Sequence, residues 1–290
     1  MHAGRLRCQD MNYRLVALDI DGTLLNSTRE VTERTRKALN SAIANGATVS
    51  LVTGRRFASA RLLSLELGLQ SPLISHNGAL TKDAATLDVI DYHPLLTSIA
   101  HQLIDIGHKQ NVDFILCEDP VGLGKVVVEK RSLERNPRLN NYVNYVKEYG
   151  LSLEVVNDLL DYQLTDVIQV MYTGTVQKME DLSSLIEREI GNEARRQWTT
   201  YREADMTILD LLNPVCSKGH GVAALARSLA IPREQVLAIG DNFNDVEMLK
   251  YAGLGIIMGN AEPGLKSLGF TETATNDEDG VALALETHVL

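Results

Sequence analysis

The segment VALDIDGTLL, Val16–Leu25, runs apolar residues directly into two aspartates, and it constrains the fold more than any other stretch of the chain. Its apolar start predicts a strand that is buried on both faces, as the strands of parallel sheets are. Asp19 and Asp21 then lie where this strand ends. Two carboxylates so close together repel each other and are costly to desolvate unless a cation or hydrogen bonds compensate. A simple turn also uses Asp and Gly for their local hydrogen bonds and permissive dihedrals, so the rest of the chain has to decide.

A helix pattern follows the two aspartates. Residues 31–47 predict a helix with Thr32 as its N-cap and Gly46 just past its end. The helical spacing places four apolar residues on one face: Ala38, Leu39, Ala42 and Ile43. A second strand, a second helix over residues 57–69 and a third strand come next. This alternation predicts right-handed crossovers and a parallel sheet.

All three predicted strands end in polar or small residues. The ends are Asp19/Asp21, Thr53/Gly54 and Asn77/Gly78. In open parallel sheets, ligands bind at the carboxyl ends of the strands. The coincidence of three such ends therefore predicts a binding site along this edge of the sheet.

The pattern changes after residue 84 and returns before the end of the chain. Residues 85–202 mix partly alternating strands with helical stretches and predict an inserted α+β domain. A helix pattern then begins at Ser217-Lys218, and a further buried strand ends in Gly240-Asp241. The fold class we predict is α/β: a three-layer, Rossmann-like core with a parallel sheet, made of residues 12–84 and 203–290, with residues 85–202 inserted into it. Residues 1–11 are expected to be a flexible tail.

The charge balance excludes some partners. The formal net charge of −10 argues against nucleic-acid binding, for which Lys and Arg must neutralise phosphates. No apolar run approaches the length of a membrane span. No apolar h-region follows the first dozen residues, so we do not expect a secretory signal. Three cysteines without metal-like or redox-like spacing fit a reducing compartment, so we expect a cytoplasmic protein, either a monomer or a homodimer.

The strand ends carry the groups needed for phosphoryl transfer. Hard oxygen ligands for Mg²⁺ come from four aspartates: Asp19, Asp21, Asp241 and Asp245. Lys218 adds one positive charge at the start of a helix, where it can meet both a phosphate and a nucleophile. Thr53 and the Gly54 amide offer donors for phosphate oxygens near a second helix start. Metal, cation and hydroxyl around one carboxylate suit phosphoryl transfer by positioning and electrostatics.

Four motifs in this order, DIDGTLL, TGR, SKG and GDNFND, resemble the haloacid dehalogenase-like superfamily and, within it, the Cof-like phosphatases. The resemblance implies that Asp19 is the nucleophile and forms an aspartyl-phosphate, and that Asp21 is the general acid and base. It also implies that Mg²⁺ is held by the Asp19 carboxylate, the Asp21 carbonyl and Asp241, with Asp245 in support. The position of the insertion resembles the α/β cap, type C2, of the type II subgroup.

The resemblance also implies substrate contacts. Thr53 and Gly54 would hold the phosphoryl group, Lys218 would balance its charge, and Asn244 could reach a phosphate oxygen. Two residues keep alternatives open. Arg55 either binds the substrate or pairs with a carboxylate of the core, and Asn77 either contacts the leaving group or only supplies turn geometry before Gly78.

We therefore expect a Mg²⁺-dependent phosphatase that acts on small phosphorylated metabolites, sugar phosphates above all. Substrate choice would belong to the inserted cap. Two alternatives use the same fold. A phosphomutase would transfer the phosphoryl group from Asp19 to a sugar, and a non-catalytic sensor would only bind a phosphorylated metabolite.

Overall fold

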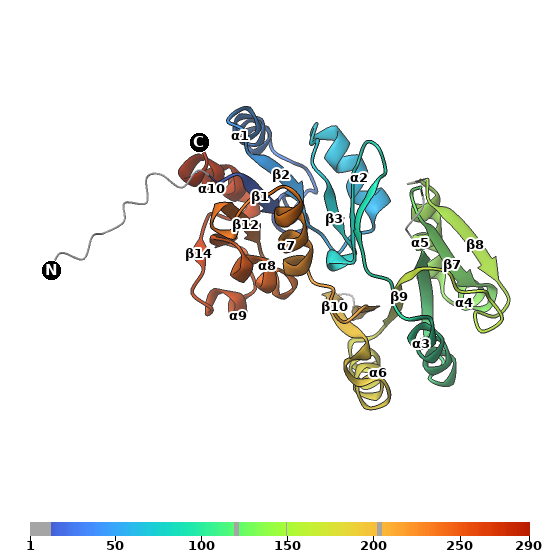
Figure 1. The fold of residues 1–290 in the computed structure, drawn as a ribbon. Coiled ribbons are helices and arrows are strands. Elements are labelled where there is room, and N and C mark those ends of the chain that lie inside the picture. The colour runs from blue at the N-terminus through green and yellow to red at the C-terminus, as the bar shows by residue number, and fades with distance from the viewer. Residues whose placement is uncertain (1–12, 119–121, 149, 202–204) are drawn as a thin grey trace. The chain divides into compact units, whose positions relative to one another are not determined.

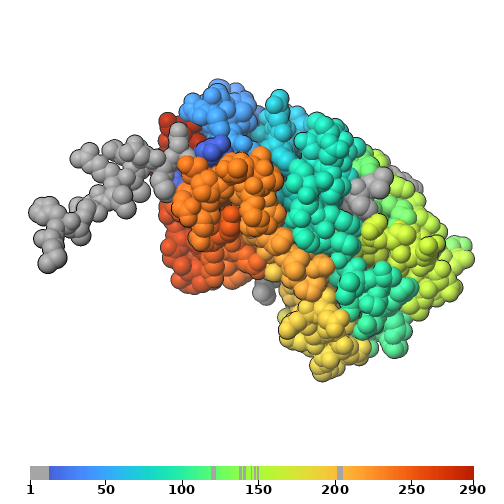
Figure 2. Space-filling model, viewed as in Figure 1, coloured from blue at the N-terminus to red at the C-terminus, as the bar shows by residue number. Residues whose placement is uncertain are grey.

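The computed structural model describes residues 13–118, 122–148, 150–201 and 205–290, and these form two compact units. The first unit contains residues 13–53, 66–72 and 217–290, and the second contains residues 54–65 and 73–216 outside the gaps (Figure 1). The tail predicted for residues 1–11 lies outside the described residues. Figure 2 shows that the early, blue part of the first unit packs against its late, orange to red part, although they are far apart in the sequence.

A parallel sheet forms the centre of the first unit. Its strand order is β14-β13-β12-β1-β2, and every neighbouring pair is parallel. The strands are β1 (Leu15–Leu18), β2 (Thr48–Leu51), β12 (Val236–Gly240), β13 (Leu254–Ile257) and β14 (Thr271–Glu272). All residues of β1 and β12 are buried, as the apolar runs in the sequence predicted. The predicted α/β class with a parallel core sheet is confirmed.

The helices of the first unit begin and end close to their predicted bounds. The Thr32 side chain accepts a hydrogen bond from the Thr35 amide at the start of α1 (Glu33–Ala44), and Gly46 follows with a φ of 91°. Of the predicted apolar face, Ala38, Leu39 and Ala42 are buried, whereas Ile43 is 38% exposed. The other α-helices are α7 (Lys218–Ser228), α8 (Val246–Tyr251), α9 (Pro263–Lys266) and α10 (Gly280–His288).

A six-stranded mixed sheet organises most of the second unit, in the order β10-β11-β9-β6-β7-β8. Only the β7–β8 pair is parallel. The strands are β6 (Asp113–Glu118), β7 (Lys125–Glu129), β8 (Ser152–Val156), β9 (Val167–Gly174), β10 (Arg195–Tyr201) and β11 (Met206–Leu212). The helices α3 (Thr97–Lys109) and α6 (Val176–Glu189) share one apolar core with it, built around Phe114 and Tyr172. Two further helices are α4 (Lys130–Arg135) and α5 (Pro137–Glu148).

The third predicted strand does not join the parallel sheet. After α2 (Phe57–Glu66), β3 (Leu73–Ser75) pairs antiparallel with β4 (Leu80–Lys82), which pairs with β5 (Val89–Tyr92). The strand stops at Ser75, and His76–Gly78 form the short turn η1. Positive φ values at all three residues of this turn reverse the chain and start an antiparallel hairpin. The prediction of a third parallel strand ending at Asn77-Gly78 was therefore wrong.

The boundaries of the two compact units differ from the predicted domain boundaries. Residues 54–65, 73–84 and 205–216 belong to the second unit, because β3 pairs within it and β11 lies between β9 and β10. The predicted core (residues 12–84 and 203–290) and cap (residues 85–202) are functional domains, and their bounds remain a prediction. Among the described residues, no helix is both long and apolar enough to cross a membrane.

Candidate active site

The neighbouring strands β1 and β12 bring Asp19 and Asp241 to the same edge of the sheet. Each aspartate directly follows its strand, and the Asp19 amide donates a hydrogen bond to the Ile239 carbonyl at 3.1 Å. Asp19 is only 4% exposed, so its carboxylate lies in a largely dry environment. Parallel pairing thus produces the carboxylate cluster that the two motifs predicted.

Lys218 bridges two of the aspartates. It is the first residue of α7, whose N-cap Ser217 accepts a hydrogen bond from the His220 amide. The Lys218 Nζ atom lies 2.5 Å from Asp19 Oδ1 and 2.6 Å from Asp245 Oδ1. Lys218 is 2% exposed, so this ammonium is held by carboxylates rather than by water.

Asp245 fastens the loop that carries Asp241. Its Oδ2 atom accepts hydrogen bonds from the backbone amides of Asp241, at 3.0 Å, and Asn242, at 2.9 Å. Asp245 also closes a capping box with Asn242 at the short helix η5 (Phe243–Asp245). Ligand atoms of Asp19, Asp241 and Asp245 nevertheless lie within 4.8 Å of one another, close enough to share one ion.

The electrostatics of this cluster fit a divalent cation. Burial raises the pKa of Asp19 well above its usual value; Lys218 lowers it, and the charges of Asp245 and Asp241 raise it further. Burial and the charge of Asp245 raise the pKa of Asp241 to about 6. The pKa of Lys218 is raised although burial lowers it, because Asp19 and Asp245 favour the ammonium. With all three carboxylates ionised, one ammonium would leave two excess negative charges, which a Mg²⁺ ion would neutralise through the oxygen donors it prefers.

Two neighbours of the aspartates complete the site, although neither was predicted as a site residue. Thr23 Oγ1 donates a hydrogen bond to Asp241 Oδ1 at 2.9 Å and fixes that carboxylate. Gly22 has a φ of 79°, and a Cβ added there would lie 2.9 Å from the Asp241 Cγ atom. Both residues belong to the DGT of the first motif, so the sequence did carry a signal for them.

The other predicted site residues divide between the two units. In the first unit, Asp21 is exposed, Thr53 is buried just beyond β2, and Asn244 is half-buried in η5. Gly54, Arg55 and Asn77 belong to the second unit. There, the Asn77 side chain packs on Gly54, since its Nδ2 and Oδ1 atoms lie 3.1 Å from the position of an added Gly54 Cβ.

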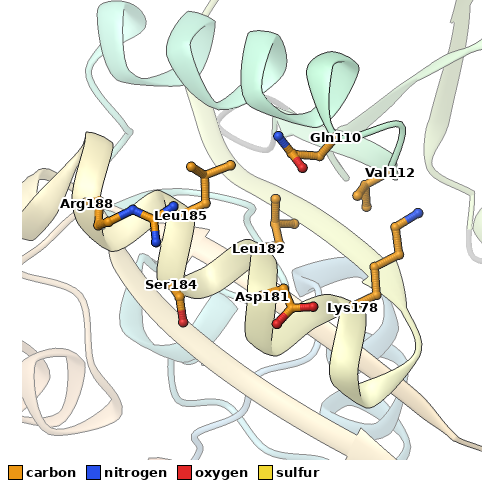
Figure 3. Close-up of a pocket in the computed structure, with 8 residues that line it drawn as sticks. All are labelled: Gln110, Val112, Lys178, Asp181, Leu182, Ser184, Leu185 and Arg188. Carbon is orange, nitrogen blue, oxygen red and sulfur yellow. The ribbon is translucent and has the colours of Figure 1, made fainter.

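The second unit also has a surface hollow at the C-terminal end of α3 and along α6, drawn in Figure 3. Its polar side chains include Lys178, Asp181 and Arg188, all on α6. None of the predicted site residues lines this hollow.

Comparison with known proteins decides the family. The sequence model of the haloacid dehalogenase-like hydrolases matches residues 16–285, which span both motif-bearing segments and the insertion between them. The chain belongs to this family. Its Bacillus subtilis relative, the putative phosphatase YxeH, is 32% identical over 96% of this chain and 99% of its own length.

Two other relatives of this haloacid dehalogenase-like hydrolase are named for their substrates. The 5-amino-6-(5-phospho-D-ribitylamino)uracil phosphatase YitU of Bacillus subtilis is 28% identical, over 94% of this chain and 96% of its own. The pyridoxal phosphate phosphatase YbhA of Escherichia coli is 26% identical, over 97% of this chain and 100% of its own.

Solved structures agree with the fold. A haloacid dehalogenase-like hydrolase from Bacteroides thetaiotaomicron superposes with a TM-score of 0.79 at 26% identity, covering 95% of this chain and 99% of its own. The subclass IIB sugar phosphatase BT4131 has a TM-score of 0.74 at 22% identity, with 94% and 98% of the two chains covered, and shows the same core sheet and inserted domain. The predicted family, the Cof-like subclass IIB type and the enzyme class, a phosphatase, are confirmed.

Proposed function

We propose that this phosphatase is Mg²⁺-dependent and hydrolyses small phosphorylated metabolites, sugar phosphates first, through an aspartyl-phosphate on Asp19. The observation that carries the proposal is the buried Lys218, held at 2.5 Å from Asp19 and 2.6 Å from Asp245. Burial raises the pKa of Asp19, and the Lys218 ammonium opposes that rise and so favours the ionised, nucleophilic carboxylate.

The residues that would hold Mg²⁺ are the Asp19 carboxylate, the Asp21 carbonyl and Asp241, with Asp245 in support. When bound, the ion supplies positive charge to phosphoryl oxygens and relieves the repulsion among these carboxylates. Thr23 keeps the Asp241 carboxylate oriented for this task through its hydrogen bond.

The reaction has two steps on the side chains of this chain. The Asp19 carboxylate attacks phosphorus, the ester P–O bond breaks, and Asp21 donates a proton to the departing alkoxide. A water molecule then attacks the phosphorus of the aspartyl-phosphate, Asp21 takes its proton, and phosphate leaves as Asp19 is restored. Lys218 balances the developing charge, while Thr53, the Gly54 amide and Asn244 hold phosphoryl oxygens.

Substrate choice belongs, in this proposal, to the inserted domain of residues 85–202, and the chemistry belongs to residues 12–84 and 203–290. Arg55 and Asn77 are assigned to the substrate side, as contacts to the phosphoryl or leaving group. The relatives YitU and YbhA are named for different phosphate esters, which supports a shared phosphoryl site with a variable leaving-group site. The protein would work in the cytoplasm, as a monomer or a homodimer.

The test is phosphate release from a panel of sugar phosphates and from an aryl phosphate, with Mg²⁺ and with chelator, for the wild type and Asp19→Asn. Metal-dependent release that the substitution abolishes supports the proposal. Release that persists in Asp19→Asn contradicts it. Isomerisation of a sugar phosphate without phosphate release would establish a mutase, and metabolite binding without turnover would establish a sensor.

A further inference from the structure

A row of three buried polar side chains crosses the second unit beside Asn77. The His76 Nδ1 atom lies 2.6 Å from Gln169 Oε1, and Gln169 Nε2 donates to Asp210 Oδ1 at 2.5 Å. None of the three is more than 5% exposed. They come from different elements, the turn η1 and the strands β9 and β11, so the row ties this turn to the sheet of the same unit.

The hydrogen bonds have one direction. Asp210 at neutral pH is an acceptor only, so it draws the amide nitrogen of Gln169 toward itself. The Gln169 oxygen therefore faces His76, which must donate from Nδ1. A single carboxylate on β11 thus fixes first the amide and then the plane and tautomer of the imidazole ring.

The turn that this row holds is strained. His76 and Asn77 have φ values of 48° and 52°, in the left-handed region that non-glycine residues rarely adopt, and Gly78 follows at 92°. Such backbone persists only where its surroundings hold it in place, and it concentrates at functional sites. Here the His76 amide donates to the Arg55 carbonyl at 3.0 Å, and the His76 side chain is fully buried against Gln169.

The strained η1 turn determines where the Asn77 side chain lies. Its carboxamide packs on Gly54, the residue that directly follows Thr53 in the proposed phosphoryl-binding segment. We propose that His76, Gln169 and Asp210 are positioning residues that hold the η1 turn in its left-handed form, so that the Asn77 carboxamide is fixed over Gly54 for substrate recognition. This inference rests on the proposed function and adds three residues that do not touch the substrate themselves.

Gln169→Leu is the most direct test, because it removes both hydrogen bonds at little cost in volume. We expect kcat/KM for an aryl phosphate to fall by about 10- to 100-fold, the scale on which misplaced substrate contacts reduce rates. Asn77→Ala is expected to have a similar effect, and the double variant should be no worse than either single one, since both lose the same contact. Losses that multiply in the double variant, or an unchanged kcat/KM in Gln169→Leu, would overturn the proposal.

Asp210 offers a conservative pair that separates positioning from stability. Asp210→Asn keeps an oxygen that can accept from Gln169, although it no longer imposes that direction, and it should retain most of kcat/KM. Asp210→Leu should reproduce the loss in Gln169→Leu. Thr207→Val is the matched control, because the buried Thr207 lies on β11 like Asp210. The substitution breaks its hydroxyl contact with Thr200 on the neighbouring β10 and leaves the row intact. If Thr207→Val lowers kcat/KM as much as Gln169→Leu, the role is only structural. Failure of the proposed function would appear instead as activity that survives Asp19→Asn.

Discussion

At Asp19, one buried ammonium lies beside a cluster of three carboxylates, and this imbalance underlies the chemistry that we propose for the site. Lys218 contacts Asp19 and Asp245 directly, while Asp241 is held by the hydroxyl of Thr23. Ion pairs buried in this way cost desolvation energy and add little to stability by themselves. The proposed function gives these pairs a purpose, because they would hold a nucleophilic carboxylate and the ligands of a cation in fixed positions.

Asp21 should be required for turnover and dispensable for folding. Its side chain is exposed, so Asp21→Asn should leave the melting temperature unchanged. The carboxamide cannot donate or take the proton, and kcat should fall by about 10²- to 10⁴-fold, the usual contribution of general acid–base catalysis. Steady-state kinetics and thermal unfolding of the same preparation check both parts. An unchanged kcat would remove Asp21 from the mechanism.

Lys218 should matter for stability as well as for catalysis. Lys218→Met leaves the buried carboxylates without their cation, and breaking such a pair costs about 3–5 kcal/mol of unfolding free energy. Urea unfolding in chelator at pH 7 measures this loss. Lys109→Met is the control, because Lys109 forms an exposed pair with Asp105 on the surface of α3 and should show no measurable change. Equal effects of the two substitutions would contradict the buried-pair interpretation.

At the scale of single elements, the catalytic strands and helices could be predicted from the sequence because local chemistry marks their ends. The cap of α1 at Thr32 and the strand ends at Asp19 and Asp241 lie where apolar runs meet polar residues. No comparable local pattern in the sequence shows which neighbouring strand a given strand pairs with. β3 is as fully buried as β1, yet the left-handed turn after Ser75 directs it into an antiparallel hairpin. Side chains such as Gln169 and Asp210, distant in sequence from His76, also carried no local signal.

The buried carboxyl of Asp210 on β11 predicts a pH dependence of stability. Burial raises its pKa to about 6, although the Gln169 hydrogen bond and His76 lower it. The folded state therefore holds this proton more tightly than the unfolded chain, whose Asp pKa is about 3.9. As pH rises from about 4 to about 6, the wild type therefore loses the unfolding free energy that the protonated Asp210 contributes. Asp210→Asn has no titrating group at this position and does not lose it. The stability of Asp210→Asn relative to the wild type should thus increase by up to about 3 kcal/mol between pH 4 and pH 7.

Urea unfolding of both proteins across this pH range measures the difference, and other titrating groups cancel in it. A stability difference that is the same at pH 4 and pH 7 would show that Asp210 keeps an ordinary pKa in the folded protein.

At the scale of the whole molecule, the two units differ in how much of their function could be predicted from sequence motifs. The first unit carries the motifs DIDGTLL, SKG and GDNFND, and together with TGR these motifs predicted the family and the cluster of aspartates around Lys218. The second unit includes Gly54 and Arg55 of the TGR motif, but its own core consists of ordinary apolar residues, and no motif marks side chains that would contact a leaving group. Relatives named for different phosphate esters fit this asymmetry, because a leaving group can change while the phosphoryl site stays the same.

Mg²⁺ should stabilise the protein through the carboxylate cluster of the first unit. An ion that binds only the folded state adds about 2.7 kcal/mol at a concentration 100 times its Kd. Differential scanning calorimetry with MgCl₂ and with chelator should therefore show a higher melting temperature in the metal. Asp241→Asn should abolish that difference, since it removes one of the three clustered carboxylates. A metal-induced shift of the same size in Asp241→Asn would place the ion elsewhere.

The aspartyl-phosphate itself can be measured by acid quenching during turnover of a radiolabelled phosphate ester in the presence of Mg²⁺. We predict label on the wild-type protein that hydroxylamine removes, as it does from acyl phosphates, and no label on Asp19→Asn. Equal labelling of Asp19→Asn, or rapid hydrolysis by the wild type with no labelled protein at any quench time, would contradict a covalent mechanism at Asp19.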